Sequence, residues 1–402
     1  MEQFNDFIRT IERFWTSPDW LSNRMLFLSG PRQVGKTTLV RSTLCHRDDA
    51  YFNWDHRGVR TRFLKDPDFF SGTDAPWICF DEIHKRPKWK DVLKGVYDTY
   101  KNKFKFVVTG SARLETFKKS GDSLMGRYFH THLFPLNLPD FQKNDFSFSS
   151  DPEYLICKAA DKPDAPEMGH LLAFGGFPEP YLKGSDRFLR RWSAQHKDLI
   201  IHEDIRDLSR VLELDKMDIL FDMIQPSLGS PMSYRGLSLD LEATPNSVKR
   251  WLQILGLVHL IFSIPPYTRR IRRSYLVEKK WYLTDWSQAK TNPFENFVAA
   301  SLLRAVQLWF DRFGERMSLF YVRTHDGAEV DFLICRNRVP WLLIESKEGK
   351  PEPTHAVYRF ARELGVPAVV VTKESGIFRK IPTGEGQRIY ALSWSKLGSL
   401  LP

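Results

Sequence analysis

The sequence contains little cysteine and no long apolar run. The cysteines, Cys45, Cys79, Cys157 and Cys335, are scattered without C-x-x-C spacing, which argues against a disulfide scaffold or a zinc site. No apolar stretch is long enough to span a bilayer. The start of the chain, residues 1–6, is acidic and lacks the basic-then-apolar plan of a secretion signal. We therefore expect a cytoplasmic protein with no membrane partner.

The remaining composition favours a folded protein with several domains. Hydrophobic residues make up 42% of the chain and aromatic residues 14%, which excludes an intrinsically disordered protein. A length of 402 residues indicates two or three domains. The formal net charge of +10 suits a polyanionic partner such as DNA, although many basic proteins bind no nucleic acid.

The first apolar run, residues 25–29, is followed by the phosphate-binding pattern G-x-x-x-x-G-K-T. Its glycines let successive backbone N–H groups point at phosphate oxygens, and a helix that begins at Lys36 adds its positive end. Lys36 would reach the β- and γ-phosphates, and Thr37 would offer its hydroxyl to Mg²⁺. The predicted triphosphate-binding residues are Gly30, Pro31, Arg32, Gln33, Val34, Gly35, Lys36, Thr37 and Thr38.

A second apolar run, residues 77–80, ends in the adjacent carboxylates Asp81 and Glu82. A parallel sheet presents ligands at the carboxyl ends of its strands. We expect Asp81 to hold the Mg²⁺ shell, commonly through water, and Glu82 to polarise the attacking water and accept its proton. The alternative is a helix N-terminus that favours acidic residues after a core strand.

Two further catalytic candidates follow. The strand expected over residues 104–109 ends near Thr109 and Ser111, either of which would lie near the γ-phosphate if this strand neighbours the phosphate strand. Arg127 precedes another apolar strand, residues 128–134. It would point toward a nucleotide bound by a neighbouring subunit and stabilise developing charge, or it is a surface arginine in a local salt bridge. The sequence leaves the oligomeric state open, and a homo-oligomer would give Arg127 this target.

One more strand is expected over residues 50–55, inserted in the sequence between the loop and the acidic pair. The loop, the segments 80–84, 108–112 and 124–127, and Gly175-Gly-Phe-Pro178 occur in this order. Together they resemble the prokaryotic AAA-type P-loop ATPases that carry a winged helix and a C-terminal restriction-endonuclease-like domain of unknown function. The resemblance implies ATP and Mg²⁺ as cofactors and ATP hydrolysis as the activity.

The expected fold class is α/β: a P-loop ATPase parallel sheet with a helical lid, a winged helix, and a small α/β nuclease-like C-terminal domain. The expected boundaries are residues 1–142 for the ATPase core, 143–207 for the lid, 208–290 for the winged helix-turn-helix and 291–402 for the last domain. Helical periodicity in the lid is broken at residues 175–178.

A DNA-binding surface is expected in the winged helix. A short helix over residues 233–240 precedes an amphipathic helix that begins near Thr244 and ends at Gly256. Apolar Val248, Leu252 and Leu255 share one face of it, which leaves Lys249 and Arg250 outward. Strands over residues 257–264 and 281–284 flank a basic wing that holds Arg269, Arg270, Arg272, Arg273, Lys279 and Lys280. The helix would enter the major groove and the wing would contact phosphates, or the unit is a protein-binding module with a solvated basic face.

The last domain carries a second constellation. Glu295 lies in the first turn of an expected helix, Asp331 lies in a strand, and Glu345 and Lys347 share one face of a neighbouring strand. Such acids with a lysine can hold Mg²⁺ and activate water for phosphodiester cleavage, and they resemble the restriction-endonuclease-like core. The alternative is an inert binding module in which Glu345 and Lys347 form an ion pair.

Two functions therefore compete. The chain is an ATPase that couples its nucleotide state to DNA binding and to metal-dependent DNA cleavage, or it is a nucleotide-driven regulatory switch. In the second case the C-terminal domain is a non-catalytic protein- or DNA-binding module.

Overall fold

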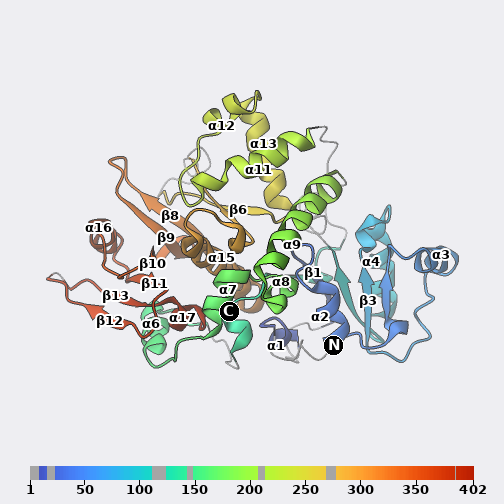
Figure 1. The fold of residues 1–402 in the computed structure, drawn as a ribbon. Helices are drawn as coiled ribbons and strands as arrows, with labels where there is room; N and C mark the ends of the chain where they lie inside the picture. The colour runs from blue at the N-terminus through green and yellow to red at the C-terminus, as the bar shows by residue number, and fades with distance from the viewer. Residues whose placement is uncertain are drawn as a thin grey trace. The chain divides into compact units, whose positions relative to one another are not determined.

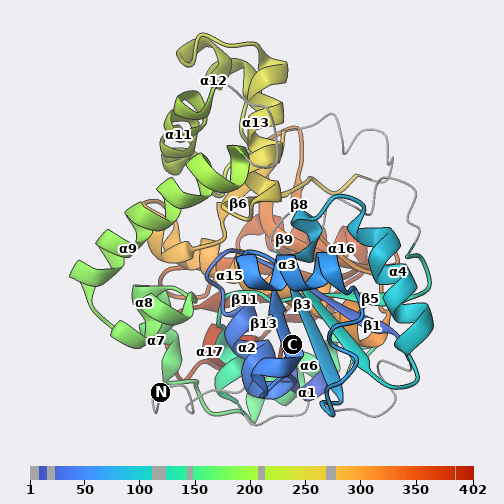
Figure 2. The ribbon, with the colours of Figure 1, turned by 90° about the vertical axis from the view of Figure 1, so that its right-hand side faces the viewer.

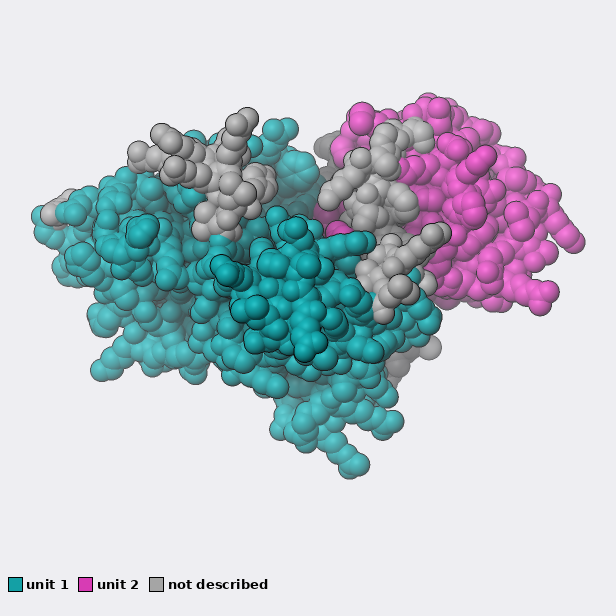
Figure 3. All heavy atoms as spheres, turned by 90° about the horizontal axis from the view of Figure 1, so that it is seen from above, with its two compact units in different colours: residues 1–10, 135–256, 260–402 teal, residues 11–134, 257–259 magenta. Residues whose placement is uncertain are grey.

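The computed structural model describes residues 9–15, 23–110, 124–142, 148–206, 213–268, 278–384 and 386–402 (Figure 1). The chain divides into two compact units, which Figure 3 shows in different colours. The N-terminal unit comprises Ile11–Phe134 and Leu257–His259, and the C-terminal unit comprises Met1–Thr10, Pro135–Gly256 and Leu260–Pro402. Each unit is described separately below.

The N-terminal unit is built on a five-stranded parallel sheet in the order β2-β3-β4-β1-β5. Strands β1, β3 and β5 of this sheet are labelled in Figure 2. All five residues of β1 are buried, as a strand covered on both faces requires. The strands expected from the apolar runs are confirmed. The strands are β1 (Met25–Ser29), β2 (Tyr51–Asn53), β3 (Trp77–Asp81), β4 (Lys105–Thr109) and β5 (Tyr128–His132).

The strand that separates the phosphate strand from the acidic strand is β4, which pairs with β1 and β3. The segment inserted in the sequence, β2, lies instead at the sheet edge beside β3. Leu28 of β1 is in register with Thr109 of β4, so the two strands are neighbours, which is the condition on which the role suggested for Thr109 or Ser111 depended. The sheet order and its parallel strands fit the expected P-loop ATPase fold class.

Helices cover this sheet. The apolar face of α4 packs with aromatic side chains of β1, β3 and β4 in one core, and α2 contacts β4. Helix α2 begins at Lys36, as predicted. The helices of the unit are α1 (Glu12–Trp15), α2 (Lys36–Thr43), α3 (Arg57–Lys65) and α4 (Trp89–Tyr100), with 3₁₀ turns η2 (Asp48–Ala50) and η3 (Ile83–Lys85).

The C-terminal unit begins with helices. The segment predicted as a lid is helical and is broken at Gly175, as expected, and also at Gly184. Both glycines have positive φ, 74° and 53°, a region that favours glycine at helix ends. The elements are η5 (Leu138–Phe141), α6 (Pro152–Ala160), α7 (Glu167–Phe174), α8 (Pro178–Lys183), α9 (Asp186–Leu199) and the π-helix η6 (Ile200–Ile205).

The next elements are three helices and a two-stranded antiparallel sheet. Val248, Leu252 and Leu255 of α13 are fully buried, as the amphipathic pattern predicts. The helix extends to Leu257, so the following strand is shorter than expected. The elements are α11 (Leu214–Met223), η7 (Gln225–Ser227), α12 (Tyr234–Asp240), α13 (Pro245–Leu257), β6 (Ile261–Ile264) and β7 (Lys280–Leu283).

The last part is a mixed six-stranded sheet in the order β12-β13-β11-β10-β9-β8. Helices α15 and α16 contribute to two separate cores with alternating residues of β9 and β10, so they cover opposite faces of this sheet. The elements are η8 (Trp286–Gln288), α15 (Pro293–Phe313), β8 (Met317–Arg323), β9 (Glu329–Arg336), β10 (Val339–Lys347), α16 (His355–Leu364), β11 (Ala368–Thr372), β12 (Phe378–Ile381), β13 (Ile389–Ser393) and α17 (Trp394–Gly398).

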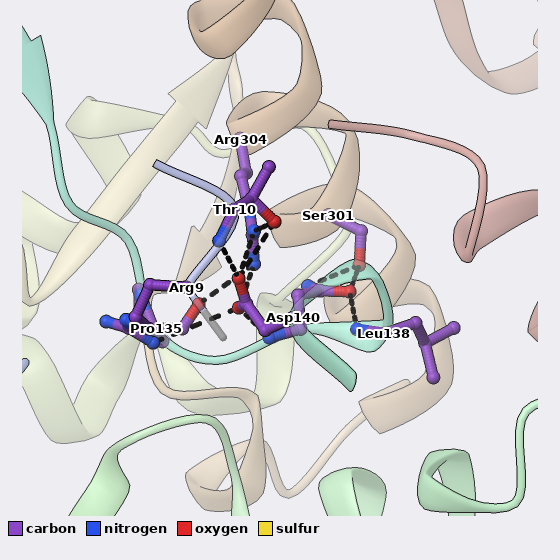
Figure 4. A network of polar contacts seen from close by, with 8 residues as sticks. Arg9, Thr10, Pro135, Leu138, Asp140, Ser301 and Arg304 are labelled. Carbon is purple, nitrogen blue, oxygen red and sulfur yellow. Dashed lines mark hydrogen bonds and ion pairs between the residues drawn. The ribbon is translucent and has the colours of Figure 1, made fainter. Parts of the chain in front are cut away.

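A buried ion pair joins three distant segments of the C-terminal unit (Figure 4). Arg304 of α15 donates to both carboxylate oxygens of Asp140 at 2.6 and 2.8 Å and to the Thr10 hydroxyl at 2.8 Å. The backbone N–H of Thr10 donates to the same carboxylate at 2.8 Å. Burial alone raises the pKa of Asp140, but the charge and hydrogen bonds of Arg304 outweigh it and lower this pKa to about 2.

We predict that Asp140→Asn destabilises the C-terminal unit by about 3 kcal/mol or more, because it leaves the Arg304 charge buried and unpaired. Thermal unfolding against pH measures this. Since the folded Asp140 has a depressed pKa of about 2 against an ordinary 3.8, the pair stabilises fully above pH ~4 and this contribution is lost as pH falls toward 2. The matched control is Asp326→Asn in an exposed ion pair with Arg359, which should change stability little. Equal effects of the two substitutions would contradict the prediction.

Candidate functional site

The loop between β1 and α2 has the backbone curl that the glycine pattern predicts. Gly30 and Gly35 have φ of 152° and 97°, and between them Gln33 has φ of 61°. A Cβ added at Gly30 would lie 2.2 Å from the carbonyl oxygen of Leu133, so no other residue fits there.

Lys36 and Thr37, the first residues of α2, face the loop and the acidic strand. The Lys36 ammonium donates to the carbonyl oxygens of Gly30 and Pro31 at 2.9 and 2.7 Å. The Thr37 Oγ1 lies 3.3 Å from Asp81 Oδ2 and donates to it. The phosphate loop and the acidic strand end are thus adjacent, as the sequence predicted.

The Asp81 carboxylate is buried and is held by hydroxyl groups. Besides Thr37, Tyr51 of β2 donates to Oδ2 and Thr109 of β4 donates to Oδ1. Burial and the nearby charge of Asp81 raise the pKa of Tyr51, so its phenol stays protonated and remains a donor. Tyr51 lies in a strand that the sequence predicted, but it was not among the predicted site residues. A polar-tipped aromatic in the strand next to Asp81 was the available signal.

Glu82 leaves the sheet in a left-handed conformation with φ of 57°. Its backbone N–H donates to the Thr109 carbonyl at 3.0 Å. Its Oε2 lies 3.3 Å from His84 Nε2 and 3.4 Å from Lys85 Nζ. Burial raises the pKa of Glu82, while the charge of Lys85 opposes this rise. A carboxylate with a raised pKa is a better proton acceptor near neutral pH than an ordinary one.

These groups fit Mg²⁺ and a triphosphate. A hydroxyl and a carboxylate oxygen are the hard ligands that Mg²⁺ takes together with water and phosphate oxygens, and Thr37 and Asp81 bring them to one place. The curled loop and the Lys36 ammonium supply donors for phosphate.

Of the two further catalytic candidates, Ser111 lies outside the described residues. Arg127 forms a two-point ion pair with Asp98 of α4, with N–O distances of 2.9 and 3.0 Å, and its side chain is 28% exposed. This is the local salt bridge that the sequence left as the alternative, and a role of Arg127 toward a neighbouring nucleotide stays a prediction that requires release of Asp98.

The predicted DNA-binding face of α13 is partly described. Lys249 and Arg250 are exposed, opposite the buried stripe of this helix. Burial and the charge of Lys249 lower the pKa of Lys279, which shows that these two cations lie near each other. Arg269, Arg270, Arg272 and Arg273 lie outside the described residues.

The four acidic and basic candidates of the C-terminal domain do not form one site. Burial and also the charge of Asp331 raise the pKa of Glu345, so these two acids still interact, but their direct partners differ. Lys347 Nζ lies 2.6 Å from Glu345 Oε1, and Thr354, the N-cap of α16, donates to Oε2 at 3.1 Å. Their expected common face is confirmed, and it is the α16 face of the sheet. Asp331 instead accepts from the N–H and hydroxyl of Ser346 at 2.9 and 2.8 Å. Because side chains alternate along β10, Ser346 and Glu345 point to opposite faces.

Asp331 belongs to a different group, which we call the acidic cluster: Glu295, Glu329 and Asp331. Lys280 Nζ lies 2.6 Å from Glu329 Oε1, 3.6 Å from Glu295 Oε1 and 3.6 Å from Asp331 Oδ1. Lys280 is 1% exposed. The expectation that Lys280 belongs to a solvated wing is therefore wrong, because its side chain turns inward to these carboxylates.

The acidic cluster does not fit a divalent metal. The Lys280 ammonium lies between its carboxylates, and Glu345 is held by Lys347 on the other face. Within the described residues no group of three or more His, Cys, Asp or Glu side chains could hold a metal ion. The Mg²⁺ that the restriction-endonuclease-like resemblance implies therefore finds no suitable ligand set in this arrangement.

Comparisons with known proteins agree with the N-terminal assignment. Residues 22–142 match the family described as "AAA domain". Residues 166–291 and 290–394 match two families described as "Domain of unknown function", DUF8612 and DUF4143. Residues 22–142 thus form a domain of the AAA type, which indicates nucleotide binding.

Curated relatives carry no assigned activity. An uncharacterized protein of Methanocaldococcus jannaschii is 24% identical over 333 residues, which cover 78% of this chain and 73% of that protein. An uncharacterized protein of Mycobacterium tuberculosis is 23% identical over 327 residues, which cover 77% of this chain and 67% of that protein.

Similar solved structures give low scores. The Thermotoga maritima RuvB Holliday junction branch migration motor is 17% identical, covers 63% of this chain and 88% of that chain, and has a TM-score of 0.28. Thermococcus gammatolerans McrB AAA+ hexamers with bound McrC give 13% identity, coverage of 42% of this chain and 49% of that chain, and a TM-score of 0.22.

None of the described helices has both the length and the apolarity that a membrane span requires.

Proposed function

We propose that the protein binds Mg-ATP at residues 30–38 and hydrolyses it. The observation that carries this proposal is the 3.3 Å contact between Thr37 Oγ1 and Asp81 Oδ2, which joins the phosphate loop to the acidic strand end inside one compact unit. The match of residues 22–142 to an AAA domain supports it.

In this proposal each residue has a separate task. The loop amides and Lys36 bind the triphosphate, and Thr37 and Asp81 hold Mg²⁺, which when bound offsets the phosphate charge. Glu82 orients the attacking water and accepts its proton. Its raised pKa and its position next to Asp81 in the chain support this role. The hydroxyl of Tyr51 positions the Asp81 carboxylate and therefore acts through another residue.

We further propose that the face of α13 with Lys249 and Arg250 binds DNA. Two exposed cations on a helix, with Lys279 close to Lys249, attract phosphate. For the C-terminal domain we favour a non-catalytic binding module over a nuclease, because the acidic cluster is filled by Lys280 and does not fit a metal. The nucleotide state of the protein would then regulate DNA binding without DNA cleavage.

Lys36 and Glu82 have different expected tasks, so their substitutions should have different effects. Lys36→Ala should abolish ATP binding, because the β- and γ-phosphates lose their cation. Glu82→Gln should retain ATP binding and lose about 10²-fold or more in turnover, since an amide accepts no proton. Binding of a fluorescent ATP analogue and phosphate release measure the two effects, with the exposed Lys65→Ala as control. Unchanged hydrolysis by Glu82→Gln would reject Glu82 as the water activator.

The second prediction concerns Tyr51. Tyr51→Phe removes one donor to Asp81, and a hydrogen bond to a charged group contributes about 1.5–3 kcal/mol. We expect the Mg²⁺ concentration for half-maximal turnover to change by roughly tenfold, while metal-free nucleotide binding stays the same. Titration of turnover with Mg²⁺ measures this. Tyr154→Phe on the exposed surface of α6 is the control, and an unaltered Mg²⁺ response in Tyr51→Phe would exclude a positioning role.

The third prediction concerns DNA. The double substitution of Lys249 and Arg250 by Ala should weaken duplex binding and reduce the slope of log K against log salt by about 2, one for each lost phosphate contact. Removal of Lys183 and Arg187, two exposed cations of the same unit, changes the net charge equally and should leave the slope unchanged. Equal effects of the two pairs would indicate non-specific charge attraction, and absence of binding by the wild type would favour a protein-binding module.

A further inference from the structure

The Lys280 side chain is enclosed on several sides. Its ammonium contacts the acidic cluster at 2.6 to 3.6 Å and lies 5.5 Å from the centre of the Tyr321 ring. Tyr282 donates to Glu295 Oε1 at 2.8 Å. A Cβ added at Gly229 would lie 2.8 Å from the same oxygen, so backbone closes this side of the cluster as well.

Strand pairing in β7 and β9 determines where Lys280 and the carboxylates of the acidic cluster lie. Lys280 pairs with Ile264 across the β6–β7 sheet and forms a bridge to Pro231 on its other side, which fixes the point from which its side chain leaves. Strand β9 shifts register against β8, so that two of its residues, Asp331 and Phe332, oppose Tyr321. Such a bulge redirects a side chain, and here it leaves Asp331 on the side of the sheet that carries Glu329.

The charged side chains around Lys280 shift one another's pKa values. Burial alone lowers the pKa of Lys280, but Glu295, Asp331 and Glu329 raise it above its ordinary value, so the ammonium is charged. Burial and the charge of Asp331 raise the pKa of Glu295 to about 8, so this carboxyl holds a proton at neutral pH. The Lys280 ammonium therefore lies among three carboxyl groups, an arrangement that a divalent cation would have to disrupt.

We propose that Lys280 is the resident cation of the acidic cluster and that it keeps divalent metal out of the restriction-endonuclease-like domain. Mg²⁺ and Mn²⁺ need carboxylate oxygens at about 2.0–2.2 Å, and the Lys280 ammonium occupies the space where those oxygens converge. Lys280 lies in β7, which precedes the C-terminal domain in the sequence, so the chain itself supplies the cation that fills the acidic cluster. This inference does not rest on ATP hydrolysis and can be tested without nucleotide.

The experiment is Mn²⁺ titration by calorimetry on the full chain, in the absence of nucleotide. We expect Lys280→Met to bind Mn²⁺ at least about tenfold more tightly than the wild type, because the carboxylates lose their internal cation. The substitution Lys290→Met removes the same charge from an exposed position outside the cluster and should behave as the wild type. Adding Asp331→Asn to Lys280→Met should abolish the gain.

Two results would overturn the inference. One is a folded Lys280→Met protein that gains no Mn²⁺ binding. The other is a wild type that binds Mn²⁺ with an affinity that falls in Asp331→Asn, since metal and lysine would then share the cluster. Should Lys280→Met alone not fold, the charge-compensated variant Lys280→Met/Glu329→Gln replaces it. That variant should still bind Mn²⁺ more tightly than the wild type, and its failure to do so also rejects the proposal.

Discussion

A carboxylate that leaves water must receive hydrogen-bond donors or a cation, and the choice of partner decides what the group can do afterwards. Asp81 receives hydroxyl groups, from Thr37, Tyr51 and Thr109. Hydroxyl donors orient the carboxylate without cancelling its charge. The negative charge at the end of β3 is therefore still available to attract a metal ion.

Asp140 and the acidic cluster receive cations instead. Asp140 is matched by the Arg304 guanidinium at 2.6 and 2.8 Å, which leaves no charge for a ligand and joins distant segments of the unit. The acidic cluster is matched by Lys280. The same physical requirement thus produces a carboxylate held by hydroxyl groups in the N-terminal unit, and a structural ion pair and an internally filled cluster in the C-terminal unit.

The sequence predicted those features that depend on local pattern. Continuous apolar runs marked β1, β3 and β4, the glycine spacing marked the loop, and the stripe of Val248, Leu252 and Leu255 marked the buried side of α13. Where the structure differs, the cause is a partner distant in the sequence. Lys280 follows a basic stretch and therefore resembles a solvated wing residue, but its acceptors begin at Glu295 and extend to Asp331, on other elements that only the fold brings together.

The separation of the C-terminal candidates has a simple geometric origin. Period-2 alternation puts Glu345 and Lys347 together but also directs them to the α16 face, away from the face that holds Glu295. The bulge in β9 leaves Asp331 with Ser346 and Lys280 rather than with Glu345. Strands that carry suitable acidic residues are thus insufficient for a metal site. The one-residue bulge in β9 and the position of Lys280 decide whether the carboxylates converge on a vacant position. In this sheet the acids near Glu295 are instead held by an internal ion pair with Lys280.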